Sequence, residues 1–358
     1  MKVFFDYAIF TLQRFGGVSN YIVNLAENFS NKIDPKIISL FHKNYYLKKS
    51  RFGNKLFFYN RVGSLIKYVN KANKVYFNYK LRKETPDLIH YTYFNEKNFY
   101  TSKAKSVITE YDLIKEKFYS KKYQDQIEYK KKLFEKVDQI ICISNNTKKD
   151  LQQEYSIDSS KISVVHLAVN KDKNFRERFL NLRPFILYVG LRPRYKNFVN
   201  AIKAYARSNK LNLNFDFVCF GGGKFSKEEE DLFRELSLDR SRIHYFQGDQ
   251  LDLNYFYHKA RVFIFPSLYE GFGIPLLEAM NMKCPIICSE TSCFPEIVNN
   301  AAILFDPTDI DSLEYKLEKL IYDEQLLLDL KEKGNKNLNR FNWYKCASET
   351  EQLYKKII

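Results

Sequence analysis

Two glutamates flank a glycine-containing stretch, "LYEGFGIPLLEAM", at residues 268–280. Glu270 and Glu278 lie eight positions apart, with Gly271 and Gly273 between them. Two carboxyl groups can act as the acid and base of a bond-cleaving enzyme, or can hold the hydroxyl groups of a ligand while the chemistry happens elsewhere. A single Glu is usually a solvated helix former. Two of them around a glycine turn indicate a functional site and leave both roles open.

The neighbouring sequence predicts where this pair lies. The apolar run "VFIFPS" (262–267) is typical of a buried strand, and Pro275 suits a first helical turn, where its missing N–H is not needed. Glu270 is therefore expected in the loop and Glu278 about one turn inside the helix. The glycines between them allow backbone N–H groups to approach a phosphate closely.

A second loop concentrates positive charge after a strand. "LYVGLRPRYKNFVNAI" (187–202) places Gly190, Arg192, Arg194 and Lys196 before a helical pattern. Guanidinium and ammonium groups bind phosphate, so this loop suits a diphosphate, although ordinary loop charges give the same pattern.

A third loop, "FTLQRFGGVSNYIVNL" (10–25), has Gly16 and Gly17 before a helical pattern. Free N–H groups at a helix start can hold an anion. A glycine pair is also common in tight turns, so this signal is weak by itself.

Short apolar runs alternate with amphipathic stretches along the whole chain. Alternation of this kind predicts an α/β fold of parallel sheets covered on both faces, with ligands beyond the carboxyl ends of the strands. We expect two doubly wound domains that face a cleft, residues 1–170 and 171–344, divided at the charged stretch "NKDKNFRERFLNLR" (170–183). The expected strands are 2–8, 36–41, 88–93, 105–112, 139–144, 162–168, 185–190, 215–221, 243–248, 262–267, 284–290 and 301–307.

Length and composition fit two soluble domains. The chain has 358 residues, 45% of them apolar, and no run of 18 apolar residues that would predict a transmembrane helix. The N-terminal stretch contains Asp6 and reads as a buried strand rather than a signal peptide. Four of the six cysteines lie in or beside apolar runs, and Cys284, Cys288 and Cys293 lack the spacing of a zinc site. A reduced, cytoplasmic protein without a metal is the simpler interpretation.

Positive charge gathers in the first half of the chain. The net charge is +16, and residues 1–170 carry 30 Lys and Arg against 16 Asp and Glu. Segments 43–61, 66–83 and 117–136 interleave Lys and Arg with Tyr and Phe. This mixture favours an anionic membrane surface. A solvated basic face is the alternative, and no motif supports nucleic acid.

Taken together, these motifs resemble the family 4 glycosyltransferases, which have the GT-B fold of two Rossmann-like domains. The resemblance covers nearly the whole chain. Its most specific motif is the pair of glutamates after "FIFPS", and "YVGLRPRYKN" resembles the phosphate-binding loop. Further matches are "PDLIHYTY", "VITEYDLI", "VDQIICISNNTKKDL", "CPIICSETSCFPEIVNNAAILFDP" and "RFNWYKCA". A last helix at about 345–358 is expected to pack back on the first domain.

The resemblance implies a nucleotide-sugar donor and a role for each matching residue. Arg192 and Lys196 would bind the diphosphate, Glu278 the ribose and Glu270 the transferred sugar. Gly16 and Gly17 would approach the diphosphate from the other domain. Backbone groups of Gly271, Phe272, Gly273 and Ile274 would contact sugar and phosphate. The "CFGGG" turn with Gly222, and "QGDQL" with Gln250 and Leu251, would border the base.

This chain departs from the family pattern at two places. Many members have His before the Asp of "TEYD", where this chain has Tyr111, so only Asp112 remains as a contact for sugar or acceptor. Arg192 and Lys196 are four positions apart where many members have five, so Arg194 is an alternative to Arg192.

The resemblance further implies retention of the anomeric configuration without a metal ion. The acceptor hydroxyl would attack on the face that the diphosphate leaves, and a diphosphate oxygen would take its proton. We expect a hexose donor, with mannose from GDP-mannose or another nucleotide sugar such as a UDP-sugar. The acceptor would be a glycan or lipid-linked saccharide of a bacterial surface polysaccharide, at the inner face of the membrane. A nucleotide-sugar epimerase, a phosphorylase and a non-catalytic member remain as alternatives.

Overall fold

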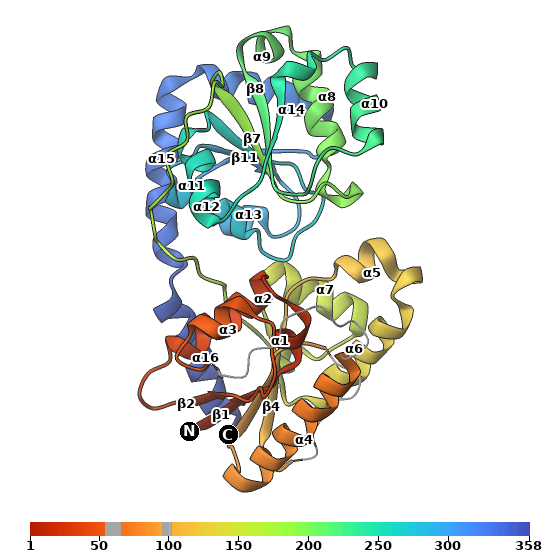
Figure 1. The fold of residues 1–358 in the computed structure, drawn as a ribbon, viewed down its shortest axis with the longest axis vertical. Coiled ribbons are helices and arrows are strands. Elements are labelled where there is room, and N and C mark those ends of the chain that lie inside the picture. The colour runs from red at the N-terminus through yellow and green to blue at the C-terminus, as the bar shows by residue number, and fades with distance from the viewer. Residues whose placement is uncertain (54–65, 95–99, 101) are drawn as a thin grey trace. The chain divides into compact units, whose positions relative to one another are not determined.

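The computed structural model describes residues 1–53, 66–94, 100 and 102–358, which form two units. Unit 1 comprises Met1–Ala168 together with Phe341–Ile358, and unit 2 comprises Val169–Arg340. The sequence places these borders at residues 170 and 344. Each unit contains one parallel sheet with helices around it (Figure 1).

The sheet of unit 1 has the strand order β2-β1-β3-β4-β5-β6, and all of its pairs are parallel. The strands are β1 (Lys2–Phe5), β2 (Asp34–Ile37), β3 (Leu88–Tyr91), β4 (Lys105–Glu110), β5 (Gln139–Cys142) and β6 (Ile162–Val164). The helices are α1 (Ala8–Leu12), α2 (Gly17–Glu27), α3 (Tyr45–Lys49), α4 (Ile66–Glu84), α5 (Ile114–Tyr119), α6 (Gln124–Lys136), α7 (Asn145–Tyr155) and α16 (Trp343–Ile357).

The sheet of unit 2 has the order β12-β11-β10-β7-β8-β9 and is again parallel. Its strands are β7 (Phe185–Val189), β8 (Asp216–Phe220), β9 (Ile243–Phe246), β10 (Val262–Phe265), β11 (Ile286–Ser289) and β12 (Ile303–Phe305). The helices are α8 (Phe198–Arg207), α9 (Asn209–Asn214), α10 (Lys227–Glu235), α11 (Gln250–Lys259), α12 (Ile274–Asn281), α13 (Phe294–Val298), α14 (Ile310–Tyr322) and α15 (Glu324–Asn337). Apolar strand residues such as Ile186 and Ile264 form the core with α8 and α14.

Each strand that the sequence predicts overlaps a strand of the structure, but the predicted bounds are generally too long, and 2–8, 36–41 and 162–168 are wrong by three residues or more, the last ending at Val164. The predicted strand 2–8 ends at Phe5, because the Asp6 carboxylate accepts hydrogen bonds from the N–H groups of Ala8 (3.2 Å) and Thr92 (3.1 Å) and turns the chain into α1. The predicted strand 36–41 lies at Asp34–Ile37 instead. Residues 40 and 41 leave the sheet because both N–H groups donate to the amide oxygen of Asn73.

The C-terminal helix α16 packs in unit 1 against α2. The Tyr354 hydroxyl lies 2.6 Å from Nδ1 of the buried His90, whose Nε2 lies 2.9 Å from the Thr109 hydroxyl. Burial lowers the pKa of His90 to about 3, so this side chain is neutral at ordinary pH. α16 thereby completes the core of the unit in which the chain begins.

Two structural facts bear on the expectations from composition. Among the described residues, no helix is both long and apolar enough to cross a bilayer. All six cysteines are buried and carry free thiols.

Candidate functional site

Unit 2 places the two most informative loops side by side. β7 and β10 are neighbouring parallel strands, so the loops that follow them leave from the same edge of the sheet. The N–H of Leu268 donates to the carbonyl of Tyr195 at 2.7 Å and joins the two loops directly. The structure thus brings residues 190–197 beside the glycine turn of residues 271–273.

Glu270 and Lys196 form an ion pair at this junction. The same carboxylate oxygen accepts a hydrogen bond from Ser267 at 2.8 Å, and the Lys196 ammonium lies 5.4 Å from the ring centre of Phe265. Both side chains are largely buried, with exposed fractions of 12% for Glu270 and 16% for Lys196. An ammonium and a carboxylate held in this way can bind a phosphate oxygen and a sugar hydroxyl next to each other.

The glycine turn ends at the start of α12. Gly273 has φ +91°, a left-handed conformation that favours glycine, and it precedes Ile274 and Pro275 in the first turn. Within the described part of the chain, the N–H groups of Gly273 and Ile274 have no acceptor. Two free donors at a helix N-terminus suit a negatively charged or hydroxyl-rich ligand.

Glu278 lies one turn further along α12, as the spacing predicts. It is partly buried and accepts hydrogen bonds from the Tyr257 hydroxyl (3.3 Å) and from Gln250, both on α11. Burial raises the pKa of Glu278 to about 6, and these hydrogen bonds lower it only in part. Tyr257 was missing from the sequence-based site, although its spacing of seven from Gln250 places both on one helix face.

The guanidinium of Arg192 binds other residues of unit 2. Its guanidinium binds Glu229 (Nε to Oε1, 2.6 Å) and donates to the carbonyls of Gly221 (3.3 Å), Gly223 (2.9 Å) and Lys224 (3.1 Å). Only 4% of its side chain is exposed. Arg192 therefore holds the glycine turn after β8 in this structure.

Arg194 has a different environment from Arg192. It is exposed in the short turn Arg194–Lys196, and its guanidinium makes no hydrogen bond or ion pair with any residue that the structure describes. Gly190 and Gly222 pack backbone to backbone, because a Cβ on Gly222 would lie 2.4 Å from the Gly190 carbonyl oxygen. Leu251 follows Gln250 in the first turn of α11.

Unit 1 contains the remaining predicted residues. Gly16 is the N-cap of α2 and lies against the end of the Gln13 side chain, which would have to move to admit a Cβ, since that atom would lie 2.2 Å from Oε1 of Gln13. The N–H groups of Gly17 and Val18 have no acceptor among the described residues. Asp112 follows β4, and its carboxylate accepts a 3.0 Å hydrogen bond from the N–H of Ile114, the first residue of α5.

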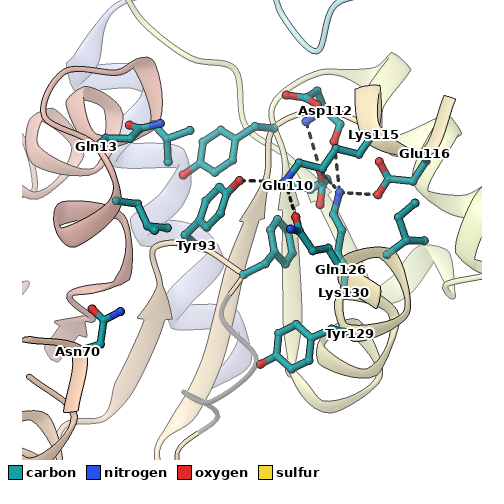
Figure 2. A pocket seen from close by; sticks show the side chains of 15 residues that line it. Gln13, Asn70, Tyr93, Glu110, Asp112, Lys115, Glu116, Gln126, Tyr129 and Lys130 are labelled. Carbon is teal, nitrogen blue, oxygen red and sulfur yellow. Dashed lines mark hydrogen bonds and ion pairs between the residues drawn. The ribbon is translucent and has the colours of Figure 1, made fainter. Parts of the chain in front are cut away.

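A cavity of about 570 Å³ lies at the carboxyl ends of β3 and β4 in unit 1 (Figure 2). Side chains from α1, α2, α4, α5 and α6 complete its wall. The lining is aromatic and polar, and comprises Leu12, Gln13, Val18, Asn70, Tyr93, Phe94, Glu110, Tyr111, Asp112, Lys115, Glu116, Gln126, Ile127, Tyr129 and Lys130. Aromatic faces combined with amides and carboxylates are well suited to a polyhydroxylated ring.

A buried charge cluster forms part of this cavity wall. The Lys130 ammonium lies 2.7 Å from Glu110 and 2.8 Å from Glu116, and it donates to the carbonyl of Asp112 at 3.3 Å. Burial raises the pKa of Glu110, which is 1% exposed. Burial alone would lower the pKa of Lys130, but the two carboxylates raise it overall. Nothing in the sequence singled out this cluster, because Glu110 stands in an apolar strand and Lys130 in a lysine-rich helix.

The clusters in unit 2 do not contain a set of metal ligands. In the described ranges of both units, no three His, Cys, Asp or Glu side chains converge in a way that could hold a metal ion.

Two family comparisons match nearly the whole chain. Residues 15–173 match "Glycosyltransferase Family 4", and residues 170–337 match "Glycosyl transferases group 1". The chain belongs to the family 4 glycosyltransferases. The resemblance that the motifs indicate is therefore confirmed, and the chain is a glycosyltransferase by family.

Curated relatives of this glycosyltransferase are distant. It is 26% identical over 252 residues to the O-antigen chain mannosyltransferase B of Escherichia coli, which covers 65% of each chain. It is 27% identical over 184 residues to the O-antigen chain mannosyltransferase RfbU of Salmonella typhimurium, which covers 51% of this chain and 50% of the relative. The chain thus spans between half and two thirds of the length of these relatives.

Solved structures confirm the GT-B fold. Sucrose-phosphate synthase from Thermosynechococcus elongatus has a TM-score of 0.76 at 19% identity, covering 99% of this chain and 98% of the other. WaaG, a glycosyltransferase involved in lipopolysaccharide biosynthesis, has a TM-score of 0.70 at 16% identity and 99% coverage of both chains. Anabaena Alr3699/HepE, solved with UDP and glucose, has a TM-score of 0.74 at 14% identity, again with 99% coverage of both chains.

Proposed function

We propose that this family 4 glycosyltransferase moves a hexose from a nucleotide-diphosphate sugar to a glycan or lipid-linked saccharide, with retention of configuration and without a metal ion. The carrying observation is the Lys196–Glu270 ion pair beside the free N–H groups of Gly273 and Ile274. These groups supply a cation, a hydroxyl-binding carboxylate and two donors at one edge of the sheet. A sugar joined to a diphosphate needs this combination.

The donor would lie along α12 of unit 2. Glu270 would accept hydrogen bonds from the sugar hydroxyls, and Lys196 would bind the diphosphate with Arg194. Glu278, with Gln250 and Tyr257 beside it, would accept hydrogen bonds from the ribose hydroxyl groups. The two glutamates would then hold two parts of one ligand, and neither would act as a general acid or base.

In the proposed reaction the acceptor hydroxyl attacks the anomeric carbon from the face that the diphosphate leaves. The bond from that carbon to the diphosphate oxygen breaks, and a diphosphate oxygen takes the proton of the acceptor. Lys196 and the N–H groups at the start of α12 would stabilise the charge that develops on the leaving group. An oxyanion donor of this kind contributes about 10²–10³ in rate in other enzymes.

The acceptor would bind in the unit 1 cavity. Its charged lining has three acidic side chains, Glu110, Asp112 and Glu116, against two lysines, Lys115 and Lys130. A lining without excess positive charge and with four aromatic rings favours an uncharged sugar ring over a phosphate. The diphosphate of a lipid carrier would lie outside this cavity. Because unit 1 carries 33 Lys and Arg against 18 Asp and Glu, we place the protein in the cytoplasm, peripheral on the inner membrane face.

Mannose is the first candidate for the transferred sugar. Curated relatives in Escherichia coli and Salmonella typhimurium are O-antigen mannosyltransferases, which also supports a role in bacterial surface polysaccharide synthesis. Thermal-shift measurements with GDP-mannose and with UDP-, dTDP- and CMP-sugars test the donor. A selective rise in melting temperature with GDP-mannose is expected. If the melting temperature rose with UDP-glucose alone, glucose would take the place of mannose as the proposed sugar.

Two substitutions test the donor residues. Glu270→Ala and Glu278→Ala should each slow sugar transfer by at least about tenfold, because each removes charged hydrogen bonds to the donor. Glu324→Ala is the control, since this exposed glutamate in unit 2 forms a surface ion pair with Arg261. Wild-type transfer rates in both site variants would refute the donor assignment.

A further inference from the structure

Helix α4 in unit 1 has two chemically distinct faces. Its buried residues Val69, Asn73, Phe77 and Leu81 recur every fourth position and contact the core. The opposite face is exposed and contains no acidic residue. It consists of Lys67, Tyr68, Lys71, Val75, Tyr79, Arg82 and Lys83. Figure 1 shows α4 along the outside of unit 1.

The apolar residues of this exposed face form a stripe. Tyr68, Val75 and Tyr79 are 69%, 63% and 54% exposed. At about 100° per residue, these three positions fall within about 40° of one another around the helix. The exposed face of a solvated helix is normally polar throughout. Aromatic and aliphatic side chains at its centre therefore indicate a surface that a partner covers.

The charges around the stripe indicate an anionic partner. Lys71 and Arg82 lie on one side of it, and the Lys83 ammonium reaches the Tyr79 hydroxyl at 3.3 Å on the other. The only acidic residue of α4, Glu84, pairs with Lys36 (2.6 Å) and Lys80 (2.8 Å). It therefore leaves the positive charge of the exposed face uncompensated.

We propose that this exposed face of α4 docks on the anionic surface of a lipid bilayer. The inference rests on the membrane association proposed above and names the helix that mediates it. Tyr rings sit at the boundary between headgroups and acyl chains, and Lys and Arg extend from there to lipid phosphates. Val75 at the centre of the stripe fits an acyl boundary, whereas a nucleic-acid backbone offers it no apolar contact.

Vesicle flotation with the whole protein tests this inference. The probes are vesicles of phosphatidylcholine alone and vesicles of phosphatidylcholine with phosphatidylglycerol in equal parts. The charge variant replaces Lys67, Lys71, Arg82 and Lys83 by Gln, and the stripe variant replaces Tyr68, Val75 and Tyr79 by Gln. Glutamine is a good helix former, so α4 should persist, and circular dichroism verifies this.

Two control variants carry the same changes on unit 2. One replaces the exposed lysines Lys210, Lys227, Lys319 and Lys336 by Gln, which lowers the net charge by the same amount. The other replaces the exposed Leu213, Tyr315 and Leu328 by Gln, three apolar or aromatic residues as in the stripe variant. We expect the wild type and both controls to float with the anionic vesicles only. Each α4 variant should bind them at least about tenfold more weakly.

Three results would overturn the inference. The wild type does not float with anionic vesicles, or an α4 variant floats as well as the wild type, or the unit 2 charge control loses binding as much as the α4 charge variant. Labelled duplex DNA is run in parallel, and α4-dependent binding of DNA without flotation would assign this face to nucleic acid. Thermal shifts with nucleotide sugars report on donor binding separately, so a failure here leaves the proposed transfer reaction intact.

Discussion

At the level of single residues, Glu278 predicts how donor binding depends on pH. The pKa of its carboxyl is raised to about 6 by burial, so the group becomes protonated as the pH falls through about 6. A protonated carboxyl accepts fewer hydrogen bonds from ribose hydroxyls. We expect the affinity for a nucleotide diphosphate to fall over this range, measured by calorimetry. The variant Glu278→Gln should bind weakly with no such change, and an unchanged pH profile in that variant would contradict the role of Glu278.

Substitutions of Arg192 and Arg194 distinguish a structural role from a role in ligand binding. Arg192→Gln should lower the free energy of unfolding by about 2–4 kcal/mol, because it frees three backbone carbonyls and leaves Glu229 without its partner. Arg194→Gln should leave stability within about 0.5 kcal/mol and weaken nucleotide-diphosphate binding about tenfold. Urea denaturation and calorimetry measure the two effects. If the Arg192 variant had normal stability but lost nucleotide-diphosphate binding, Arg192 and not Arg194 would be the main ligand of the diphosphate.

Lys130 neutralises two buried carboxylates, Glu110 and Glu116. Lys130→Met should lower the free energy of unfolding by about 3–5 kcal/mol, because a buried carboxylate loses its cation. Lys132→Met on the same helix removes only an exposed pair with Glu128 and should change stability by less than about 1 kcal/mol. Urea denaturation compares the two variants, and equal effects would show that the cluster does not stabilise unit 1.

At the level of elements, the glycine turn after β8 offers a matched pair of substitutions. Gly222 and Gly223 both have positive φ, at +78° and +85°, but only a Cβ on Gly222 would strike the Gly190 carbonyl. Gly223→Ala should cost about 1 kcal/mol of stability from backbone strain, and Gly222→Ala clearly more. Thermal denaturation measures the difference. Equal losses would mean that the contact between the two loops relaxes easily.

The sequence predicted the strands well and their ends less well. Continuous apolar runs such as 262–267 are typical of the buried strands of a parallel sheet, and turn residues bound them, so their approximate positions could be predicted. Two of the errors, at 6–8 and 38–41, arise where the side chains of Asp6 and Asn73 bind backbone groups and replace sheet pairing. A hydropathy pattern carries no information about such long-range side-chain contacts.

Like the strands, the candidate site could be predicted in part from the sequence. Glu270 and Glu278 stood out because of their spacing around a glycine turn, and the turn itself indicated the approach of a ligand. Lys196 could be named from the charged loop, but its pairing with Glu270 depends on the adjacency of β7 and β10. The cluster of Lys130 with Glu110 and Glu116 could not be predicted from the sequence, because its three members come from separate elements that only the fold brings together.

For the molecule as a whole, we propose that unit 2 binds the donor and unit 1 the acceptor, and this assignment predicts a pattern of amide hydrogen exchange. Addition of GDP or UDP should slow exchange in unit 2 at residues 190–197 and 266–278, where the proposed donor contacts lie. The cavity segment 110–130 in unit 1 should be unaffected, and added protection at Gly16 and Gly17 would support their predicted approach to the diphosphate. Hydrogen exchange with mass spectrometry measures this. Protection confined to the cavity segment would contradict the assignment.

The return of the chain from unit 2 to unit 1 has a consequence for synthesis on the ribosome. Residues 169–340 form one continuous unit, so unit 2 can fold as soon as that stretch has emerged. Unit 1 begins first but finishes last, because α16 covers its core only after residues 341–358 are made. Until then the apolar surface around Phe29 and His90 lacks Tyr354. During translation, the N-terminal unit is therefore the one that needs protection from aggregation.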